Sequence, residues 1–371
     1  MTNPKPIAQT AFSRRSSEGL AWLKRSMDAN KGNGASAFYA FWRYPWRKGW
    51  APPYPETTGY IIETLLDYHP VFHWDWLQDY ARSSAEWLLT KQLDSGAFPA
   101  LFGQDARPSV FNTGQILFGL SRMLEVSSSP DYIKAIHRAM SWLLENSKPN
   151  GGWKEGHYVE RFLPTYYSRA LWGMCVAGEH CSDLDWKPTV CRQLRYLENR
   201  IGADGQLDAA GFYPETPAFT HTIAYTLRGF LETALLLEDQ ACLQKLQQPV
   251  NRLYESLIEN GKLAGRYTND WVGDYSFKCL TGHAQTSLLF LRMEQVFQVE
   301  KYRLAAYQCF EEILSRQRLN SHPGSRGGLP GSSPIYGPYL PFKFPNWAVK
   351  FYLDALLQLY GLPQLFIPEE S

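Results

Sequence analysis

Apolar residues recur at helical spacing in six separate stretches of this chain. Each of these stretches keeps its apolar residues on one side, as Ala85, Leu88 and Leu89 do, and therefore predicts a helix with one face against the core. Six further stretches are rich in apolar and small residues all round, which is typical of helices buried on both sides. The one-sided stretches are 12–30, 75–92, 131–147, 186–200, 240–259 and 300–317. The stretches buried all round are 57–68, 110–125, 165–178, 219–237, 279–297 and 345–360.

A short glycine loop lies between each one-sided stretch and the buried stretch that follows it. The loop glycines at positions 34, 96, 151, 205, 261 and 327 are 62, 55, 54, 56 and 66 residues apart. Spacing this regular indicates a repeat architecture. Two helices per repeat, six times over, favour a closed ring of helical hairpins with the two chain ends side by side. We therefore predict one all-α domain, residues 1–371, with a funnel-shaped pocket where the glycine loops gather.

The buried stretches align into one stripe of positions four residues apart, and such positions share a helix face. The stripe ends in a layer where glycine is frequent, as at Gly119, Gly173 and Gly229, which would let the helices close in at the narrow end. Polar groups buried at one depth either satisfy one another or line a wet cavity, and we expect a cavity. The outermost layer is Glu56, Phe111, Thr165, His221, Thr281 and Asn346. One turn deeper lie Tyr60, Gln115, Arg169, Tyr225, Gln285 and Lys350.

Composition narrows the class of partner. Charged residues make up 20% of the chain and the net charge is +1, which gives no electrostatic reason to expect nucleic acid. Six cysteines without a CxxC pair, and no apolar segment near the N-terminus, favour a cytoplasmic protein with reduced thiols. No apolar run is long enough to span a membrane. Aromatic residues reach 15%, and many lie in or near the glycine loops, where they would form a stacking surface for sugar rings.

Two glutamates stand in matching sequence and are candidate acids. Tyr54-Pro55-Glu56-Thr57 recurs as Tyr213-Pro214-Glu215-Thr216, so Glu56 and Glu215 are expected in equivalent loops near the funnel mouth. Glycoside hydrolysis usually needs two carboxylates across the scissile bond. Acids at such a rim also serve as helix caps, so the pair is one alternative among several.

A second candidate group contains His221 and Tyr225, which lie four residues apart on the expected pore stripe. Near Arg169, such a pair suits proton abstraction beside a uronate carboxylate, the chemistry of a polysaccharide lyase or a C5 epimerase. The predicted catalytic residues are therefore His221, Tyr225, Glu215 and Glu56. The predicted substrate-binding residues are Arg169, Gln115, Tyr60, Gln285, Asn112, Tyr166, Trp153, Trp271 and Lys350.

A metal site is weakly suggested by Cys279 and His283, four residues apart on one helix, with Asp274 just before them. Zinc needs three or four such ligands. Because His283 lies two residues from Gln285, it is expected to point away from the pore stripe. We predict no metal and no cofactor.

With these residues in view, the chain resembles the (α/α)6 toroid superfamily, and more narrowly the bacterial family of the polysaccharide biosynthesis protein VpsJ. The resemblance covers about residues 50–360 and implies a role near polysaccharide assembly, with an oligosaccharide, polysaccharide or glycan precursor as partner. It implies no assigned catalytic residues. The motifs that carry it are Gln92 to Phe98, Ser109 to Gln115, Asn150-Gly151-Gly152-Trp153, Phe219 to Tyr225 and Cys279 to Gln285.

The glycine loops are also similar to those of terpene cyclases and prenyltransferase β-subunits. The acidic DxDD motif of class II cyclases is absent, since Asp183-Leu184-Asp185-Trp186 is only a fragment of it. Three hypotheses follow. The first is an enzyme that acts on a glycan by lysis, epimerisation or hydrolysis. The second is a non-catalytic glycan-binding or scaffold protein, and the third is a terpenoid cyclase-like enzyme with an apolar pocket below the polar ring.

Overall fold

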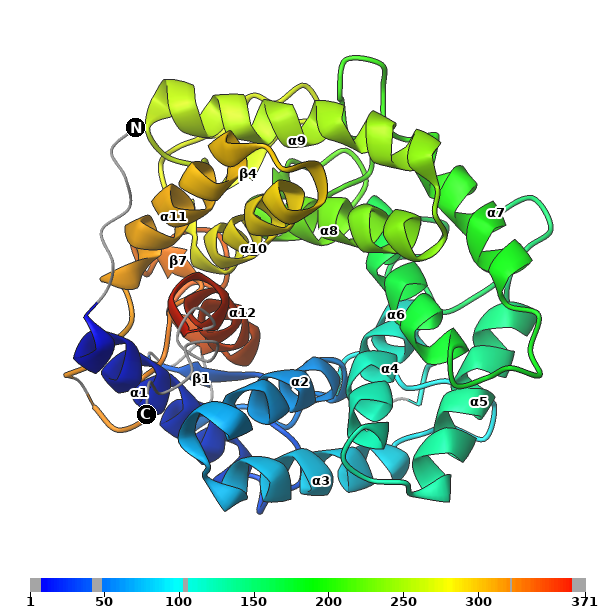
Figure 1. Cartoon of the computed structure of the whole chain (residues 1–371), viewed down its shortest axis with the longest axis horizontal. Coiled ribbons are helices and arrows are strands. Elements are labelled where there is room, and N and C mark those ends of the chain that lie inside the picture. The colour runs from blue at the N-terminus through cyan, green and yellow to red at the C-terminus, as the bar shows by residue number, and fades with distance from the viewer. Residues whose placement is uncertain (1–7, 42–48, 103–105, 321, 362–371) are drawn as a thin grey trace, which may run out of the picture.

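The computed structural model describes residues 8–41, 49–102, 106–320 and 322–361. The remaining residues of the predicted 1–371 domain lie outside the described part. Within it, the helices form two concentric rings, as Figure 1 shows. The outer helices are α1 Gln9–Asp28, α3 Asp75–Leu89, α5 Pro130–Glu145, α7 Lys187–Glu198, α9 Gln240–Asn260 and α11 Glu300–Leu314. The inner helices are α2 Pro55–Phe72, α4 Val110–Leu124, α6 Ser168–Gly178, α8 Thr220–Leu236, α10 Leu280–Phe297 and α12 Asn346–Leu356.

The predicted closed ring of six hairpins is confirmed, but the pairing is shifted by one helix. Of the outer helices, the one that follows each of α2, α4, α6, α8 and α10 packs most closely against it, so the glycine loops join neighbouring hairpins instead of the two arms of one hairpin. The inner helices contact one another in order, and α12 contacts α2 to complete the ring. The sixth hairpin is made by the first and last helices, because α1 packs against α12. The two ends of the described chain therefore meet, as expected.

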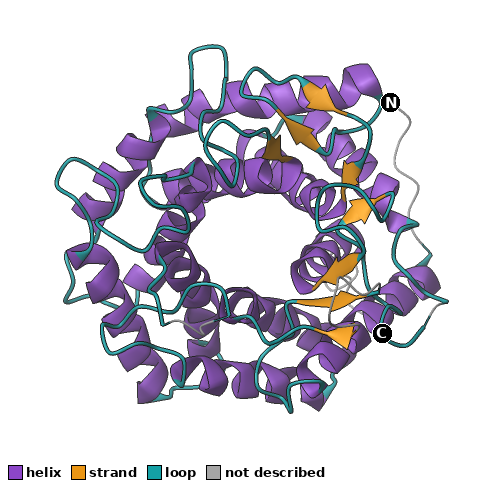
Figure 2. Ribbon diagram, turned by 180° about the vertical axis from the view of Figure 1, so that it is seen from behind, coloured by secondary structure: helices purple, strands orange, loops and turns teal. Residues whose placement is uncertain are grey.

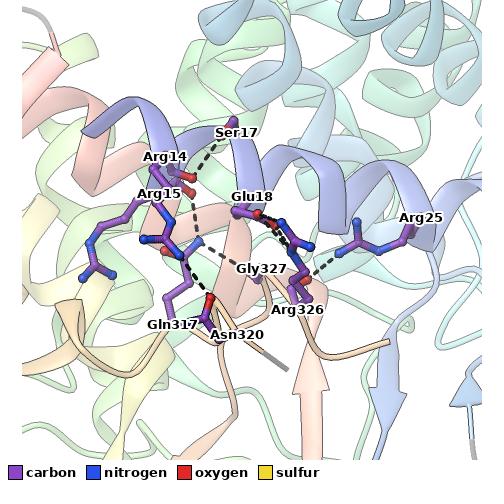
Figure 3. A network of polar contacts seen from close by, with 9 residues as sticks. All are labelled: Arg14, Arg15, Ser17, Glu18, Arg25, Gln317, Asn320, Arg326 and Gly327. Carbon is purple, nitrogen blue, oxygen red and sulfur yellow. Dashed lines mark hydrogen bonds and ion pairs between the residues drawn. The ribbon is translucent and has the colours of Figure 1, made fainter. Parts of the chain in front are cut away.

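Polar contacts hold this seam of the ring together. Figure 3 shows α1 facing the loop that follows α11, with Glu18 turned toward Arg326. The Arg326 Nε donates to Glu18 at 2.8 Å, and Gln317 donates to the carbonyl of Arg15 at 2.9 Å. The first strand also pairs with the last, with Tyr39 opposite Phe344. Segments from opposite ends of the sequence are thus joined by both side chains and backbone.

Glycines allow the inner helices to approach closely, although in a different direction from the one expected. A Cβ added to Gly173 would overlap the carbonyl oxygen of Gly114 on α4, and one added to Gly119 would overlap that of Gly59 on α2. These glycines thus face the neighbouring inner helix, not the centre of the ring. They let neighbouring inner helices pack closely, as predicted.

Local signals set several helix boundaries. Ser109 caps α4 by accepting from the amide of Asn112, and Ser129 with Pro130 opens α5. Asp239 caps α9 in the same way. A 3₁₀ turn, Thr165–Tyr167, precedes α6, and a π turn, Leu357–Gly361, follows α12.

Short strands lie in the loops on one face of the ring, the face turned toward the viewer in Figure 2. They pair in the orders β2-β1-β8, β3-β4-β5 and β6-β7. In the described part of the chain, no helix has both the length and the apolar character needed to cross a bilayer. The strands are β1 Phe38–Ala40, β2 Gly49–Trp50, β3 Ala218–Phe219, β4 Arg266–Tyr267, β5 Gly273–Asp274, β6 Lys278–Cys279, β7 Ser332–Ser333 and β8 Lys343–Pro345.

Candidate functional site

Two cavities lie along the inside of the ring. The first, which we call the funnel, has a volume of about 630 Å³ and is lined by the first turns of inner helices and by the glycine-loop end of the ring. The second, which we call the lower cavity, has a volume of about 210 Å³ and is lined by residues further along the same helices. Tyr225 lines both. The predicted funnel at the glycine-loop end is therefore present, with a smaller cavity behind it.

Aromatic side chains form most of the funnel wall. Glu56 is the one carboxylate, and His221 the one imidazole, among the described residues that line it. A concave aromatic surface with a few converging polar groups is the usual form of a small-molecule or sugar site. The aromatic residues of the wall are Tyr54, Tyr60, Phe111, Tyr158, Tyr166, Phe212, Tyr213, Phe219, Tyr225, Tyr339 and Trp347.

Glu56 is placed by the start of α2. Pro55 occupies the first position of the helix, and Glu56 follows it with 7% of its surface exposed. Burial raises the pKa of Glu56 to about 7, because the charged form loses its water. The neighbouring hydroxyl groups of Tyr54 and Tyr158 and the charge of Arg169 lower this pKa but do not cancel the effect of burial. A substantial fraction of this carboxyl group is therefore protonated at neutral pH.

A chain of polar groups supports this carboxyl group. The hydroxyl groups of Tyr54 and Tyr158 are 3.3 Å apart, and Tyr158 donates to Oδ1 of Asn112. Asn112 in turn donates to the carbonyl of Pro99 at 2.7 Å. Asn112 is fully buried and is not among the funnel-lining residues, so the structure does not place it in contact with a ligand. It holds Tyr158 instead.

His221 lines the funnel from the first turn of α8, with 5% of its surface exposed. Its Nδ1 lies 2.8 Å from Oε1 of Gln285, and an amide oxygen only accepts. Nδ1 therefore carries the proton, and Nε2 has the lone pair. Burial, partly offset by the bond to Gln285 and assisted by the charge of Arg169, lowers the pKa of His221 to about 4. At neutral pH the imidazole is uncharged.

The expected pair of His221 and Tyr225 is present, with ring centroids 4.4 Å apart. The Tyr225 hydroxyl donates to that of Tyr60 at 3.4 Å. Burial and the nearby charge of Glu56 raise the pKa of Tyr225 above its usual value. Tyr225 is consequently a neutral phenol that serves as a hydrogen-bond donor, and His221 is the better base of the two.

Arg169 is a buried cation enclosed by rings. Only 4% of its surface is exposed, and its Nε donates to Oε1 of Gln115 at 2.7 Å. No carboxylate of the described residues lies within ion-pair distance of it. Cation–π contacts supply much of the compensation for burying such a charge. The guanidinium lies 4.8 to 5.5 Å from the ring centres of Tyr225, Trp172, Phe118 and Phe351.

The predicted polar layer is real, but it separates two cavities instead of surrounding one. Tyr60 lines the funnel, whereas Arg169, Gln285 and Lys350 line the lower cavity and Gln115 is buried behind Arg169. The Lys350 ammonium is 2.5 Å from Asp354 and 3.8 Å from Glu63. The lower cavity is therefore charged, which contradicts the apolar pocket required by the terpenoid hypothesis. Its charged lining residues are Glu63, Asp67, Arg169, Arg228, Lys350 and Asp354.

Glu215 does not share the position of Glu56. It lies in an exposed turn in which Thr216 donates to the carbonyl of Tyr213 at 2.8 Å, and it does not line the funnel. Helix α8 begins only at Thr220, so the structural counterpart of Glu56 is His221. The four-residue column was right and the repeated tetrapeptide was misleading, because the two copies precede their helices by different distances.

Three predicted binding aromatics have different outcomes. Tyr166 lines the funnel, as expected. Trp153 is fully buried and packs near Tyr167, with ring centroids 6.1 Å apart, so it belongs to the core. Trp271 donates to the carbonyl of Gly205 at 2.9 Å and does not line the funnel. Neither tryptophan lines the funnel.

The residues considered for a metal have other partners. The Asp274 carboxylate is 3.0 Å from the guanidinium of Arg266, and Nδ1 of His283 is 2.9 Å from the carbonyl oxygen of Cys279. In the described ranges no group of three or more His, Cys, Asp or Glu side chains is arranged to hold a metal ion.

The acids of the lower cavity were not selected from the sequence, although a signal existed. Glu63 and Asp67 are four residues apart on α2, as Lys350 and Asp354 are on α12. Charged residues at this spacing inside helices that are otherwise apolar indicate a shared polar interior.

Together these features define an (α/α)6 toroid with an aromatic funnel whose wall includes Glu56 and His221. No protein-family model and no curated protein matches the chain, so the VpsJ family is not shown. Solved structures do match along almost the whole length. An unsaturated glucuronyl hydrolase specific for heparin has a TM-score of 0.71 at 14% identity, over 96% of this chain and 99% of that one.

Two further structures have the same architecture. An unsaturated glucuronyl hydrolase from Streptococcus agalactiae has a TM-score of 0.70 at 14% identity, covering 96% of this chain and 94% of that chain. An α-amylase from Clostridium perfringens has a TM-score of 0.67 at 12% identity, covering 93% and 97%. At these identities the likeness shows the fold alone.

Proposed function

We propose that this protein is a carbohydrate-active enzyme that takes an acidic glycan into the funnel and moves a proton with His221 and Glu56. The observation that carries the proposal is that a neutral base and a carboxyl group with a pKa of about 7 line the same aromatic cavity. Pairs of titratable groups whose environments push their pKa values in opposite directions are typical of acid–base catalysis.

The chemistry follows from the protonation states. In a lyase or C5 epimerase, Nε2 of His221 removes the proton from the carbon next to a uronate carboxylate, leaving a carbanion stabilised by that carboxylate. In the lyase, the electron pair of the carbanion then forms a carbon–carbon double bond as the glycosidic C–O bond breaks, and neutral Glu56 gives its proton to the leaving oxygen. In the epimerase, Glu56 gives its proton to the opposite face of the same carbon instead. Such proton transfers contribute about 10²- to 10⁴-fold each. The product and the enzyme together hold the same number of protons as the reactants.

The buried cation favours an anionic substrate. Arg169 lies against Tyr225, and its positive charge lowers the pKa of both Glu56 and His221. The same field attracts the uronate carboxylate and the negative charge that develops in the transition state. The neutral hydroxyl of Tyr225 provides a donor to that charge.

Hydrolysis is the second candidate, and the fold favours it because the matching solved structures include glucuronyl hydrolases and an amylase. Glu56 is, however, the one carboxylate among the described residues of the funnel wall. A mechanism with two carboxylates would need a second acid there, and Glu215 does not supply it. Hydrolysis would therefore have to use Glu56 and His221 with a water molecule.

The biological setting of this activity is part of the proposal. The sequence resemblance suggests bacterial polysaccharide biosynthesis, and the cysteine pattern suggests the cytoplasm; both stay predictions. The non-catalytic alternative, a glycan-binding or scaffold protein, would use the same aromatic funnel without turnover.

A panel of glycans tests the proposal. The protein is incubated with alginate, pectate, hyaluronan and neutral dextran, and ultraviolet absorbance of unsaturated uronate is recorded beside a reducing-end assay. We expect new absorbance with a uronate polymer, and its loss in His221→Asn and Glu56→Gln. Reducing ends without absorbance would favour hydrolysis. Binding of a uronate polymer without absorbance, reducing ends or exchange of the C5 proton in heavy water would favour the scaffold alternative.

A further inference from the structure

A groove runs along the outer surface at the seam of the ring, away from the funnel. We call it the seam groove; its volume is about 730 Å³. Its walls come from three elements: α1, the turn between α2 and α3, and the loop after α11. Helix α1 contacts α3, since Lys24 donates to the Tyr80 hydroxyl at 3.0 Å, and it contacts the loop after α11, since Glu18 accepts from Arg326. The groove is therefore built from parts of the chain that meet only when the ring closes.

The turn between α2 and α3 presents a platform of stacked rings. Helix α2 ends at Phe72, and His73 follows in a left-handed conformation with its amide bonded to the carbonyl of His69. This reversal places Trp74 before α3 and Trp76 in its first turn. The rings of Phe72 and Trp74 are 4.4 Å apart at 20°, and those of Trp74 and Trp76 are 5.9 Å apart at 24°.

Both tryptophans are only half-buried, and both line the groove. Packing of the core thus does not use their whole surface. The part of each indole that stays exposed is apolar surface of the kind against which the C–H groups of sugar rings pack.

The opposite side of the groove is basic. Lys24, Arg25 and Arg326 line it, against the single carboxylate of Glu18. Arg326 is paired with Glu18, and Figure 3 shows the Arg25 side chain turned toward the backbone of Arg326. Arg25 donates one bond to the Arg326 carbonyl, and no carboxylate of the described residues forms an ion pair with it. Arg25 is the cation of the groove whose charge is not already matched.

We propose that the seam groove binds a segment of an anionic polysaccharide, with sugar rings on Trp74 and Trp76 and a carboxylate or sulfate on Arg25. The proposal rests on the proposed function in that the substrate is taken to be an acidic glycan. A second contact on the outer wall would hold a long chain while another part of it enters the funnel. Two linked contacts raise the effective concentration of the chain at the funnel, so they strengthen binding of polymers and leave short oligosaccharides unaffected.

Native electrophoresis in gels containing alginate, with dextran gels as reference, measures this binding directly. The variants are Trp74→Ala/Trp76→Ala and Arg25→Gln, with Arg303→Gln on the outer surface of α11 as the matched control. Turnover of a short uronate oligosaccharide is measured in parallel. We expect retention by alginate to weaken about tenfold in the double tryptophan variant and several-fold in Arg25→Gln, with turnover of the short substrate unchanged. Arg303→Gln should behave as the wild type.

Wild-type retention in the folded double variant, or in Arg25→Gln if the double variant is unstable, would overturn the proposal. So would stronger competition by single-stranded DNA than by alginate oligosaccharides. The two proposals are separable. Turnover without groove-dependent retention would refute only the proposal that the seam groove binds polysaccharide. Groove-dependent retention without turnover of any glycan would support that proposal and refute the catalytic function proposed for the funnel.

Discussion

The buried carboxyl group of Glu56 should make the stability of the fold depend on pH in a way that Glu56→Gln abolishes. Burial raises its pKa from 4.5 to about 7. Below pH 4.5 the group is protonated in both folded and unfolded chains and contributes no difference. Between 4.5 and 7 the unfolded chain releases the proton while the folded chain keeps it, so stability falls as pH rises. Above about pH 7 the folded chain has also released the proton, and the stability contributed by protonated Glu56 is fully lost.

The magnitude follows from the size of the shift. A rise of about 2.5 pKa units corresponds to about 3 kcal/mol, since one unit is about 1.4 kcal/mol. Glutamine has nearly the same shape as glutamate and no charge. The free energy of unfolding of Glu56→Gln minus that of the wild type should therefore be about 3 kcal/mol larger at pH 8 than at pH 4. Any change in the bonds to Tyr54 and Tyr158 adds an offset that does not depend on pH.

Urea unfolding at pH 4, 6 and 8 measures this difference, with Glu160→Gln, an exposed glutamate, as the control. The control should show no comparable trend. An equal difference between Glu56→Gln and the wild type at all three pH values would refute the reasoning, because it would mean that Glu56 titrates normally in the folded protein.

Four further predictions concern the funnel and the ring. Substitution of His221 by Asn should lower kcat about 10²- to 10⁴-fold on a responsive glycan without unfolding the protein, and circular dichroism checks the fold. The pH profile of kcat/KM should fall below about pH 4, where His221 gains a proton, and above about pH 7, where Glu56 loses its own; a flat profile would contradict these roles. Arg169→Met should raise KM for a uronate substrate more than for a neutral one, as initial rates would show. Gly173→Ala should destabilise the fold by about 1–3 kcal/mol or more in urea unfolding, whereas Gly202→Ala, whose new methyl group meets only the flexible side chain of Gln206, should be mild.

The fold was predictable because its signals are repeated. Apolar periodicity recurs in every hairpin, and the predicted ranges agree with the helices within a few residues, as 75–92 does with Asp75–Leu89. The pairing of helices was not predictable from this pattern, because a loop length does not say whether two helices form one hairpin or join two. Only the packing of α1 on α12 decides it.

The site was predictable in part for a related reason. Spacing of four residues correctly placed Glu56 and His221 in one layer, because this spacing follows from helix geometry. Glu215 was misplaced because its tetrapeptide carries no information on where the next helix starts. Asn112 and Trp153 are polar or aromatic residues beside the mouth, yet tertiary packing turns them into the core. The division of the pore into two cavities depends on side chains from several helices meeting at Tyr225, which no single segment encodes.

Mass spectrometry of uronate glycans incubated in heavy water tests the central claim, that His221 and Glu56 move a proton at a sugar carbon in the funnel. We predict an unsaturated product, or deuterium at C5 of the recovered sugar, with the wild type, and neither with His221→Asn. Incorporation of heavy oxygen from labelled water, without deuterium at carbon and without unsaturation, would contradict proton abstraction and establish hydrolysis. An active His221→Asn variant would contradict the assignment of the base.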